Sequence, residues 1–537
     1  MTLKNLVRIL STSFYICIHV CAQVVDIEDD QYKRIHQNAV EAVLAGNTAG
    51  AIEALEGLLA GQPDDADTWY TLAIAQAHHG DAGAAVESLK QALAHGLPVG
   101  RVSAGKYNLL APLQDDAAFQ ELLRDKGSPL VHGPMVGNVT DASASFWVRT
   151  AVESEVQVRV SREPSMAGAV VSKVVRSTAA NDHTAVATVE SLAPETRYHY
   201  QVAVDNVLFP DNGTWSFKTF PLAGAPTAFR VAFGGGAGYT PQHERMWTTI
   251  KAYEPRAFLA LGDNVYIDHP EQPAIQRFTY YRRQSRPEYR GFVASIGVFS
   301  IWDDHDFGTN DCFVGAGADD PAWKRPVWRL FMNNWVNPSY GGGEKNPGCW
   351  YNFRIGDVDF IMLDGRYYRT DPEGEHPSML GPVQKKWLLD TLKAATGTFK
   401  VLASPVPWAM NTKPGSLDTW DGFPDERAEI FNTIVENQIE GVVLLSADRH
   451  RSDLWKIDWP GLYPLFECES SRLTNIHVHE KMPGALFSYN ESQSFGLLNF
   501  DTTFADPELR YTIVNIDGRG VFEHKIHRSE LDFDVVK

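Results

Sequence analysis

The C-terminal 311 residues, 227–537, alternate short apolar runs with stretches of helical periodicity. The apolar runs predict buried strands at residues 229–233, 258–261, 299–302, 358–363, 400–403 and 441–446. Residues 383–395 and 426–438 have the apolar spacing of amphipathic helices. Alternation returns at residues 495–500, 510–516 and 520–526, which predicts strands that complete the second half of the sheet. This order of elements predicts an α/β fold.

Residues 31–127 are rich in Ala and Leu, have helical periodicity and contain a repeat. Matching small and apolar residues recur 34 positions later: Gly46, Ala51, Leu55 and Leu58 as Gly80, Ala85, Leu89 and Ala92. A period of 34 is that of the tetratricopeptide repeat. Residues 106–126 predict a further capping helix. The segment is interpreted either as a plain helical hairpin or as a groove that binds a protein partner.

Residues 128–222 change to alternating apolar and polar positions, as in 145–149, 156–160, 197–202 and 215–219. Short loops such as 137–141 separate these runs. The pattern predicts a small β-sandwich. A packing scaffold is the default role for such a domain, and residues 224–226 form a linker to the segment that follows.

The first 22 residues have the form of a secretory signal. Lys4 and Arg8 give a positive start, and a short apolar run leads to Val20-Cys21-Ala22, which resembles a cleavage site. The run is too short to span a bilayer, so the mature chain is expected to have no transmembrane helix. These features predict a periplasmic or secreted protein.

Charge and cysteine content narrow the possible functions. The formal net charge is −19, which argues against a nucleic-acid-binding surface because such surfaces are basic. Local arginines and metal ions can still bind phosphate in an acidic protein. Beyond the signal, the cysteines are Cys312, Cys349 and Cys468. A Cys312–Cys349 disulfide and three reduced thiols are both compatible with the sequence.

Three predicted strands are each followed at once by Asp, and two of them also by His. Asp263 follows residues 257–261 and Tyr266 lies three positions on. A carboxylate at the end of a buried strand is where an α/β sheet places a metal or phosphate site. Asp263 has two oxygens that can bridge two metals, and Tyr266 can bind a strongly Lewis-acidic ion such as ferric iron as a phenolate. A core aromatic is the alternative interpretation of Tyr266.

The second and third strand ends offer similar chemistry. In Asp303-Asp304-His305-Asp306, Asp304 is a candidate ligand and His305 a candidate proton donor to a leaving alkoxide. Asp303 or Asp306 can orient His305 or supply another ligand, and Asn310 offers an amide oxygen. A turn rich in helix-capping Asp is the alternative.

Asp448 and His450 follow the third strand with a spacing that lets both face one side. Their neighbour Arg449 can hold phosphate oxygens. At a fourth strand end, Asp364 and Arg366 are candidates for phosphate contact or for a structural Arg–Asp pair. Together these residues predict a metal-dependent hydrolase.

Taken together, Leu261-Gly262-Asp263-Asn264-Val265-Tyr266, Trp302-Asp303-Asp304-His305-Asp306 and Ser446-Ala447-Asp448-Arg449-His450 resemble the motifs of the PhoD-like alkaline phosphatase/phosphodiesterase family, within the calcineurin-like metallophosphoesterase superfamily. The resemblance covers roughly residues 130–530. It implies a metallophosphoesterase-type sheet sandwich flanked by helices in residues 227–537, preceded by an Fn3-like β-sandwich in 128–222. The tetratricopeptide-like repeats in 31–127 lie outside the usual family plan.

The same resemblance implies a set of site residues. Asp263 would bridge two metals, and His305 would be the catalytic acid. Tyr266, Asp304, Asp448 and His450 would complete the metal ligands, and Asn310, a further candidate ligand, falls near an Asn of the family's loop. The family's metals are Fe³⁺ with Ca²⁺. It usually has a cysteine ligand after the domain's first strand, where this chain has Phe233-Gly234-Gly235-Gly236-Ala237-Gly238-Tyr239. Zn²⁺, Mn²⁺ or Mg²⁺ are therefore alternatives, and the glycines can instead let backbone N–H groups approach phosphate.

The resulting hypothesis is a secreted metal-dependent phosphoric-ester hydrolase, acting on monoesters, diesters or both. In it, a metal-bound hydroxide attacks phosphorus, with Arg366 and Arg449 as candidate phosphate contacts. The alternative hypothesis is a catalytically impaired adaptor of the same fold. On that view the missing cysteine has emptied a metal position, and the chain acts through its helical repeats.

Overall fold

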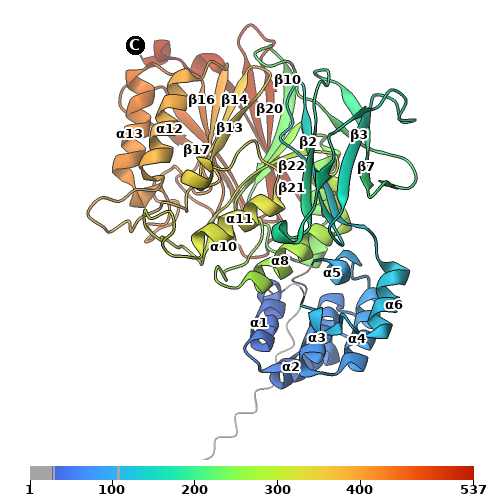
Figure 1. Cartoon of the computed structure of the whole chain (residues 1–537). Coiled ribbons are helices and arrows are strands. Elements are labelled where there is room, and N and C mark those ends of the chain that lie inside the picture. The colour runs from blue at the N-terminus through green and yellow to red at the C-terminus, as the bar shows by residue number, and fades with distance from the viewer. Residues whose placement is uncertain (1–26, 28, 30, 106–108, 537) are drawn as a thin grey trace, which may run out of the picture.

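Two large sheets form the centre of the molecule (Figure 1). The computed structural model describes residues 27, 29, 31–105 and 109–536; the proposed signal segment, residues 1–22, lies outside them. In this part of the chain one sheet has nine strands, in the order β22 (Gly520–His527), β21 (Glu508–Asn515), β20 (Ser494–Asp501), β10 (Ala228–Gly234), β11 (Ala257–Leu261), β12 (Gly297–Ile301), β1 (Leu130–Gly137), β2 (Ala144–Thr150) and β6 (Thr184–Val189).

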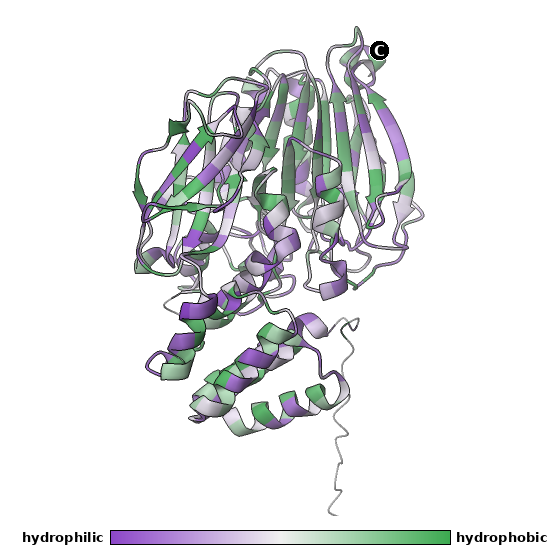
Figure 2. Ribbon diagram, turned by 90° about the vertical axis from the view of Figure 1, so that its right-hand side faces the viewer, coloured by the Kyte–Doolittle hydropathy of each residue, from purple (hydrophilic) through white to green (hydrophobic). Residues whose placement is uncertain are grey.

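The second large sheet packs face to face against the first. Within the described residues its seven strands follow the order β13 (Tyr351–Ile355), β14 (Val358–Met362), β15 (Phe399–Ala403), β16 (Val442–Ser446), β18 (Leu465–Ser470), β17 (Ser452–Ile457) and β19 (Phe487–Tyr489). Phe299 of β12 stacks on Phe353 of β13 with ring centroids 3.9 Å apart. Apolar residues dominate the central strands, as Figure 2 shows, and burial of this interface holds the two sheets together.

Helices cover the outside of this sandwich. Helices α12 (Gly381–Ala394) and α13 (Pro424–Glu436) lie on the outer face of the seven-stranded sheet (Figure 1). Helices α8 (Pro273–Ser285) and α9 (Pro287–Val293) pack against β1 of the other sheet. The remaining helices of this part are α7 (Met246–Ala252), α10 (Asp304–Phe307) and α11 (Lys324–Asn334). The sandwich flanked by helices confirms the predicted fold class, and the strands and helices predicted in residues 227–537 lie within a few residues of the observed ones.

The segment predicted as a small β-sandwich shares a sheet with the segment that follows it. Its strands β1, β2 and β6 extend the nine-stranded sheet, because Gly137 of β1 pairs in parallel with Val298 of β12. Its other strands form a separate sheet: β3 (Glu155–Ser161), β4 (Val170–Val171), β5 (Val175–Arg176), β7 (Arg197–Val204), β8 (Val207–Phe209) and β9 (Trp215–Lys218). The two segments therefore share one hydrophobic core.

The repeat segment forms antiparallel helices beneath the sheets (Figure 1). These are α1 (Tyr32–Leu44), α2 (Thr48–Gly61), α3 (Ala66–His79) and α4 (Ala82–Ala94), followed by α5 (Gly100–Ser103) and α6 (Ala117–Lys126). The repeated glycines Gly46 and Gly80 have φ of 87° and 95°. This left-handed conformation lets the chain turn sharply after α1 and again after α3. The Asn47 and Asp81 side chains accept backbone N–H groups at the starts of α2 and α4.

Two further features bear on the sequence interpretation. Cys312, Cys349 and Cys468 are all free thiols, so of the two possibilities the reduced state is the one observed. Among the helices that the structure describes, none combines the length and the apolar character needed to cross a lipid bilayer.

Candidate metal centre

The predicted site residues lie at the carboxyl ends of strands from both large sheets. Asp263 follows β11, Asp304 and His305 begin α10 after β12, and Asp448 and His450 follow β16. Because β11 and β12 are parallel, their carboxyl ends meet at one edge of the sheet. Asp263, Asp448 and His450 have φ of 51°, 67° and 46°, a left-handed conformation that costs energy in residues other than glycine and clusters at functional sites.

Asp263 and Tyr266 are buried and joined by a hydrogen bond. The Tyr266 hydroxyl donates to Asp263 Oδ2 at 2.9 Å and accepts from Asn475 Nδ2 at 2.9 Å. Burial raises the pKa of Asp263 well above its usual value, and the nearby carboxylate of Asp304 adds to the effect. Burial, and then Asp263, raise the pKa of Tyr266 in the same direction. A phenolate ligand at this position therefore requires a strongly Lewis-acidic cation.

His305 is held by a carboxylate that the sequence interpretation missed. Its Nδ1 lies 2.6 Å from Asp268 Oδ1. Asp263, Asp304 and His305 each offer a ligand atom within 4.8 Å of the others. Burial opposes a charged imidazole, but Asp304, Asp263 and Asp268 together raise the pKa of His305 to about 10. With Nδ1 donating to Asp268, the proton on Nε2 is the one that His305 can give to a substrate.

Asp448, Arg449 and His450 contribute a carboxylate, a cation and a neutral imidazole. Asp448 Oδ2 lies 3.5 Å from Arg449 Nη1. His450 Nε2 lies 3.5 Å from the Tyr266 hydroxyl. Burial, and then the neighbouring His479, lower the pKa of His450 well below its usual value. The ring is therefore neutral, which is the form that binds metals.

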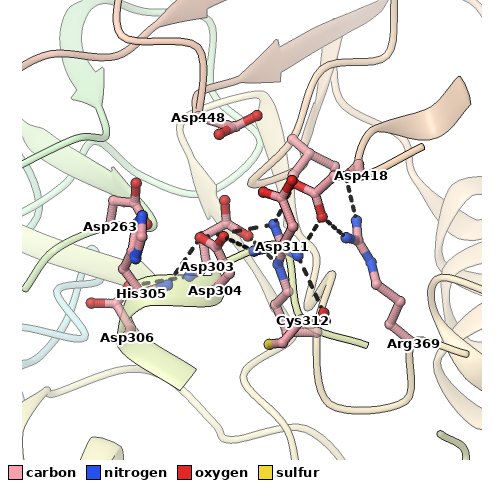
Figure 3. Close-up of polar contacts among 12 residues, drawn as sticks. Asp263, Asp303, Asp304, His305, Asp306, Asp311, Cys312, Arg369, Asp418 and Asp448 are labelled. Carbon is pink, nitrogen blue, oxygen red and sulfur yellow. Dashed lines mark hydrogen bonds and ion pairs between the residues drawn. The ribbon is translucent and has the colours of Figure 1, made fainter. Parts of the chain in front are cut away.

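A cavity of about 300 Å³ lies beside these groups, although neither Asp263 nor Asp268 lines it. Its lining combines carboxylates, imidazoles, cations and polar groups: Lys33, Arg34, Tyr266, Asp304, His305, Asn310, Asp311, Lys413, Asp448, Arg449, His450, His477 and His479. Figure 3 shows how Asp263, Asp304, His305 and Asp448 approach from different strand ends.

Unsatisfied buried atoms at the cavity fit bound cations. Asp263 Oδ1, Asp448 Oδ2 and His450 Nδ1 have no hydrogen-bond partner among the described residues. Leaving buried polar atoms without partners is costly, and oxygen and imidazole nitrogen are the ligands of hard and borderline metal ions. The residues present therefore suit one or more metal ions.

Asn310 is exposed and lines the cavity. Its neighbour Asp311 donates its backbone N–H to Asp304 Oδ2 at 2.6 Å, and its side chain pairs with Lys413 at 2.6 Å. A metal ligand role for Asn310 stays a prediction.

The cavity also contains residues that the motifs did not single out. The His477-Val478-His479 spacing was a readable signal, because its two imidazoles face one side, with Nε2 atoms 3.1 Å apart. Lys33 and Arg34 carried no such signal. They lie on α1, far away in the sequence and in a segment assigned to the repeats.

Arg366 does not line the cavity, and its assignment as a catalytic phosphate contact stays a prediction. Its side chain is fully buried and pairs with Asp303 and, at 2.6 Å, with Asp418. Asp418 in turn pairs with Arg369, a network visible in Figure 3. Arg366 Nη2 also lies 3.9 Å from Oδ1 of the candidate ligand Asp304, so carboxylates surround the guanidinium. The Arg–Asp pair is thus the interpretation that the structure favours.

Asp303 and Asp306 hold neighbouring parts of the site together. Asp306 accepts the backbone N–H groups of Val265 at 2.9 Å and Asn264 at 3.2 Å, which fixes the loop after β11. Asp303 Oδ1 accepts from Arg366, while its Oδ2 has no hydrogen-bond partner among the described residues, so a ligand role for Asp303 stays a prediction. Neither orients His305, because Asp268 does so.

The cysteine-free stretch after β10 borders the site. A Cβ added at Gly236, whose φ is +67°, would lie 3.1 Å from His450 Nδ1 but only 2.8 Å from the Arg472 backbone nitrogen. The neighbouring Gly235 and Ala237 donate their N–H groups to the carbonyls of Ser470 and Asp263. These two N–H groups are thus occupied and cannot approach a phosphate.

A two-sheet sandwich that gathers carboxylates and imidazoles at its strand ends defines the class of metallophosphoesterase folds. Within that class, the chain belongs to the PhoD-like phosphatase family, whose family model matches residues 231–534. This confirms the resemblance found in the sequence. Residues 42–98 match a tetratricopeptide repeat, and residues 127–220 match a domain of unknown function (DUF7800).

Individual relatives agree with this assignment. The chain is 31% identical to alkaline phosphatase D of Bacillus subtilis (strain 168) over 330 residues, which are 53% of this chain and 55% of that protein. It thus spans about half the length of this curated relative.

Two solved structures share the fold. The structure of PhoD aligns with a TM-score of 0.59 at 18% identity, covering 73% of this chain and 91% of that one. A purple acid phosphatase, PPD1, from yellow lupin (Lupinus luteus) seeds aligns with a TM-score of 0.52 at 10% identity, covering 75% and 76%.

Proposed function

We propose that this chain is a metal-dependent phosphoric-ester hydrolase. The observation that carries the proposal is the buried group Asp263, Asp304, Asp448 and His450 beside one cavity, in which Asp263 Oδ1 and His450 Nδ1 have no hydrogen-bond partner among the described residues. Burying carboxylate and imidazole atoms without hydrogen-bond partners costs free energy, and bound cations would offset that cost. Membership of the PhoD-like phosphatase family supports the same reaction class.

The metal ions would be held by oxygen and nitrogen ligands on the strand ends: Asp263, Tyr266, Asp304, Asn310, Asp448 and His450. When bound, such ions lower the pKa of a water nucleophile and neutralise phosphoryl oxygens. Tyr266 favours Fe³⁺ at one position, and the carboxylates suit Ca²⁺ at another. Because Gly236 and its neighbours supply no thiolate, Zn²⁺, Mn²⁺ and Mg²⁺ are alternatives.

The protein's own groups would act on the two ends of the reacting phosphate. Arg449 lines the cavity and can bind phosphoryl oxygens through its guanidinium. His305 would protonate the departing oxygen from Nε2, while Asp268 keeps the ring oriented through Nδ1. This arrangement serves monoesters and diesters alike. The charged start and short apolar run of residues 1–22 support a periplasmic or secreted location.

Elemental analysis and hydrolysis assays on one sample of the purified protein would test the proposal. The substrates are p-nitrophenyl phosphate and its bis ester. We expect bound metal and turnover in the wild type, and loss of both in Asp263→Asn. Asp390→Asn is the matched control, because Asp390 is an exposed carboxylate paired with Lys386 on α12. Little metal and no turnover after reconstitution would instead favour the adaptor hypothesis.

A further inference from the structure

The helical repeats are docked on the catalytic segment by buried contacts. Ile275 and Phe278 of α8 belong to the hydrophobic core of the repeats. The Arg101 guanidinium lies 4.6 Å from the ring centroids of both Tyr70 and Phe278. Tyr239 donates to Asp67 Oδ2 at 2.8 Å across the same interface. Figure 1 shows α1 next to α8, so α1 has a defined position beside the metal centre.

Helix α1 also bonds directly to the loop that carries the candidate ligand Tyr266. Gln37 Nε2 donates to the Tyr266 carbonyl at 2.6 Å and to Thr279 Oγ1 at 2.9 Å. The Arg282 guanidinium donates to the Lys33 carbonyl at 3.1 Å. These bonds fix the first turns of α1 against the catalytic segment.

Arg34 reaches His305 through Asp268. Its Nη1 pairs with Asp268 Oδ2, and its Nη2 lies 3.4 Å from His305 Nδ1. Asp268 Oδ1 in turn holds His305 Nδ1 at 2.6 Å. Because a carboxylate with both oxygens engaged has little freedom to rotate, Arg34 restricts the orientation of the imidazole that faces the cavity.

Lys33 lines the same cavity. Its Nζ is 3.0 Å from Asn475 Oδ1 and 4.7 Å from the Tyr266 ring centroid. Lys33 and Arg34 both line the cavity. Both lie in the first turn of α1, which has no acidic residue, although the helix dipole disfavours cations at that end. Helix stability therefore does not explain these two residues.

We propose that α1 of the repeat segment completes the catalytic site, with Lys33 as a phosphate-binding cation and Arg34 as a positioning residue for His305. The inference rests on the proposed phosphoric-ester hydrolase activity. With Lys413 and Arg449 also lining the cavity, a doubly charged phosphate monoester gains more from Lys33 than a singly charged diester does. The repeats thus favour small monoester substrates.

The test compares Lys33→Met and Arg34→Ala with Lys90→Met in the full-length, metal-loaded protein. Lys90 is exposed on α4 and pairs only weakly with Glu87 at 3.3 Å, so its substitution removes the same charge away from the cavity. The measurements are KM and kcat on p-nitrophenyl phosphate and on its bis ester, and the dissociation constant of inorganic phosphate by calorimetry. Lys33→Arg keeps the charge and controls for folding.

For Lys33→Met we expect about a tenfold higher KM for the monoester and about a tenfold weaker affinity for inorganic phosphate, because one charge-assisted hydrogen bond is lost. The diester KM changes less, and Lys33→Arg stays close to wild type. For Arg34→Ala we expect kcat to fall about tenfold or more with phosphate affinity retained. Added guanidinium ion restores part of that kcat.

Variants at positions 33 and 34 that behave like Lys90→Met would overturn the inference while leaving the hydrolase proposal intact. For Lys33→Met, equal losses on monoester and diester would also overturn it. For Arg34→Ala, a loss of kcat that added guanidinium does not restore would do the same, because it indicates a general loss of structure. A wild type that binds metal but hydrolyses neither ester refutes the proposed function instead. In that case calorimetry with inorganic phosphate still reports whether Lys33 binds phosphate.

Discussion

Replacing Arg366 with methionine separates a structural role for this residue from direct contact with phosphate. Arg366 is fully buried and pairs with Asp303 and Asp418. Methionine fills a similar volume but leaves both carboxylates without this cation, and it removes a longer ion pair of 3.9 Å to Asp304. We expect the free energy of unfolding to fall, while the affinity of the folded protein for inorganic phosphate stays unchanged.

The expected magnitude follows from what each carboxylate retains. Removing one partner of a buried ion pair costs about 3–5 kcal/mol. Asp418 keeps Arg369 and, at 3.2 Å, Lys413. Asp303 loses its cation, but burial already raises its pKa to about 8 even with Arg366 beside it, so it can become protonated near neutral pH. We therefore expect the free energy of unfolding to fall by about 3 kcal/mol, the lower end of this range.

The assay is urea unfolding followed by tryptophan fluorescence, with phosphate affinity measured on the same preparations. Arg354→Met is the matched control. Arg354 also binds one carboxylate through two nitrogens, Asp359 at 2.6 and 2.8 Å, but its side chain is 31% exposed. Arg354→Met should lower the free energy of unfolding by no more than about 1 kcal/mol. Arg366→Met with control-like stability but phosphate affinity weakened about tenfold would refute the structural role, because it indicates a lost charge-assisted contact.

Three further predictions concern the metal centre and the repeat interface. With a metal chelator present, Asp263→Asn should unfold at a higher temperature than the wild type, because burial and neighbouring carboxylates disfavour the charge of Asp263. A lower melting temperature, measured by scanning fluorimetry, would contradict this prediction. Gly236→Cys should destabilise the fold by about 1–3 kcal/mol, since φ is +67° and its Cβ would meet the Arg472 nitrogen. Gly236→Ala is the control. If Gly236→Cys with metal bound were more stable than Gly236→Ala, the result would show that a thiolate fits as a metal ligand at this position. Tyr239→Phe should cost about 1–3 kcal/mol, because buried Asp67 loses a 2.8 Å hydrogen bond; unchanged hydrogen exchange across α1 and α3 would argue against a tight interface.

The strand-end residues were predictable because their signal is local. Asp263, Asp304 and Asp448 each directly follow an apolar run, and parallel strands bring such positions to one edge. The left-handed φ of Asp263 and Asp448 has no signal in the sequence, since it depends on the packing of the finished site. Family membership confirms the class of protein, while the individual metal ligands stay predictions.

Residues whose role depends on tertiary contacts were not predictable. Arg366 sits in a motif between Asp364 and two tyrosines, and only the fold shows that Asp303 and Asp418 occupy its guanidinium. Lys33 and Arg34 lie more than 200 residues before the ligands that they approach. Repeat periodicity placed them on a helix and gave no information about what that helix faces.

The pairing of β1 with β12 has a consequence for synthesis on the ribosome. The two partners, Gly137 and Val298, are about 160 residues apart, so β12 emerges roughly 8–30 s after β1 at ordinary elongation rates. During that interval the end of β1 at Gly137 lacks its strand partner, and unpaired N–H and C=O groups at a strand edge are where chains aggregate. Truncated products that end before residue 297 lack this pairing altogether. We expect such fragments to be less soluble than the full-length chain, in which Val298 pairs with Gly137.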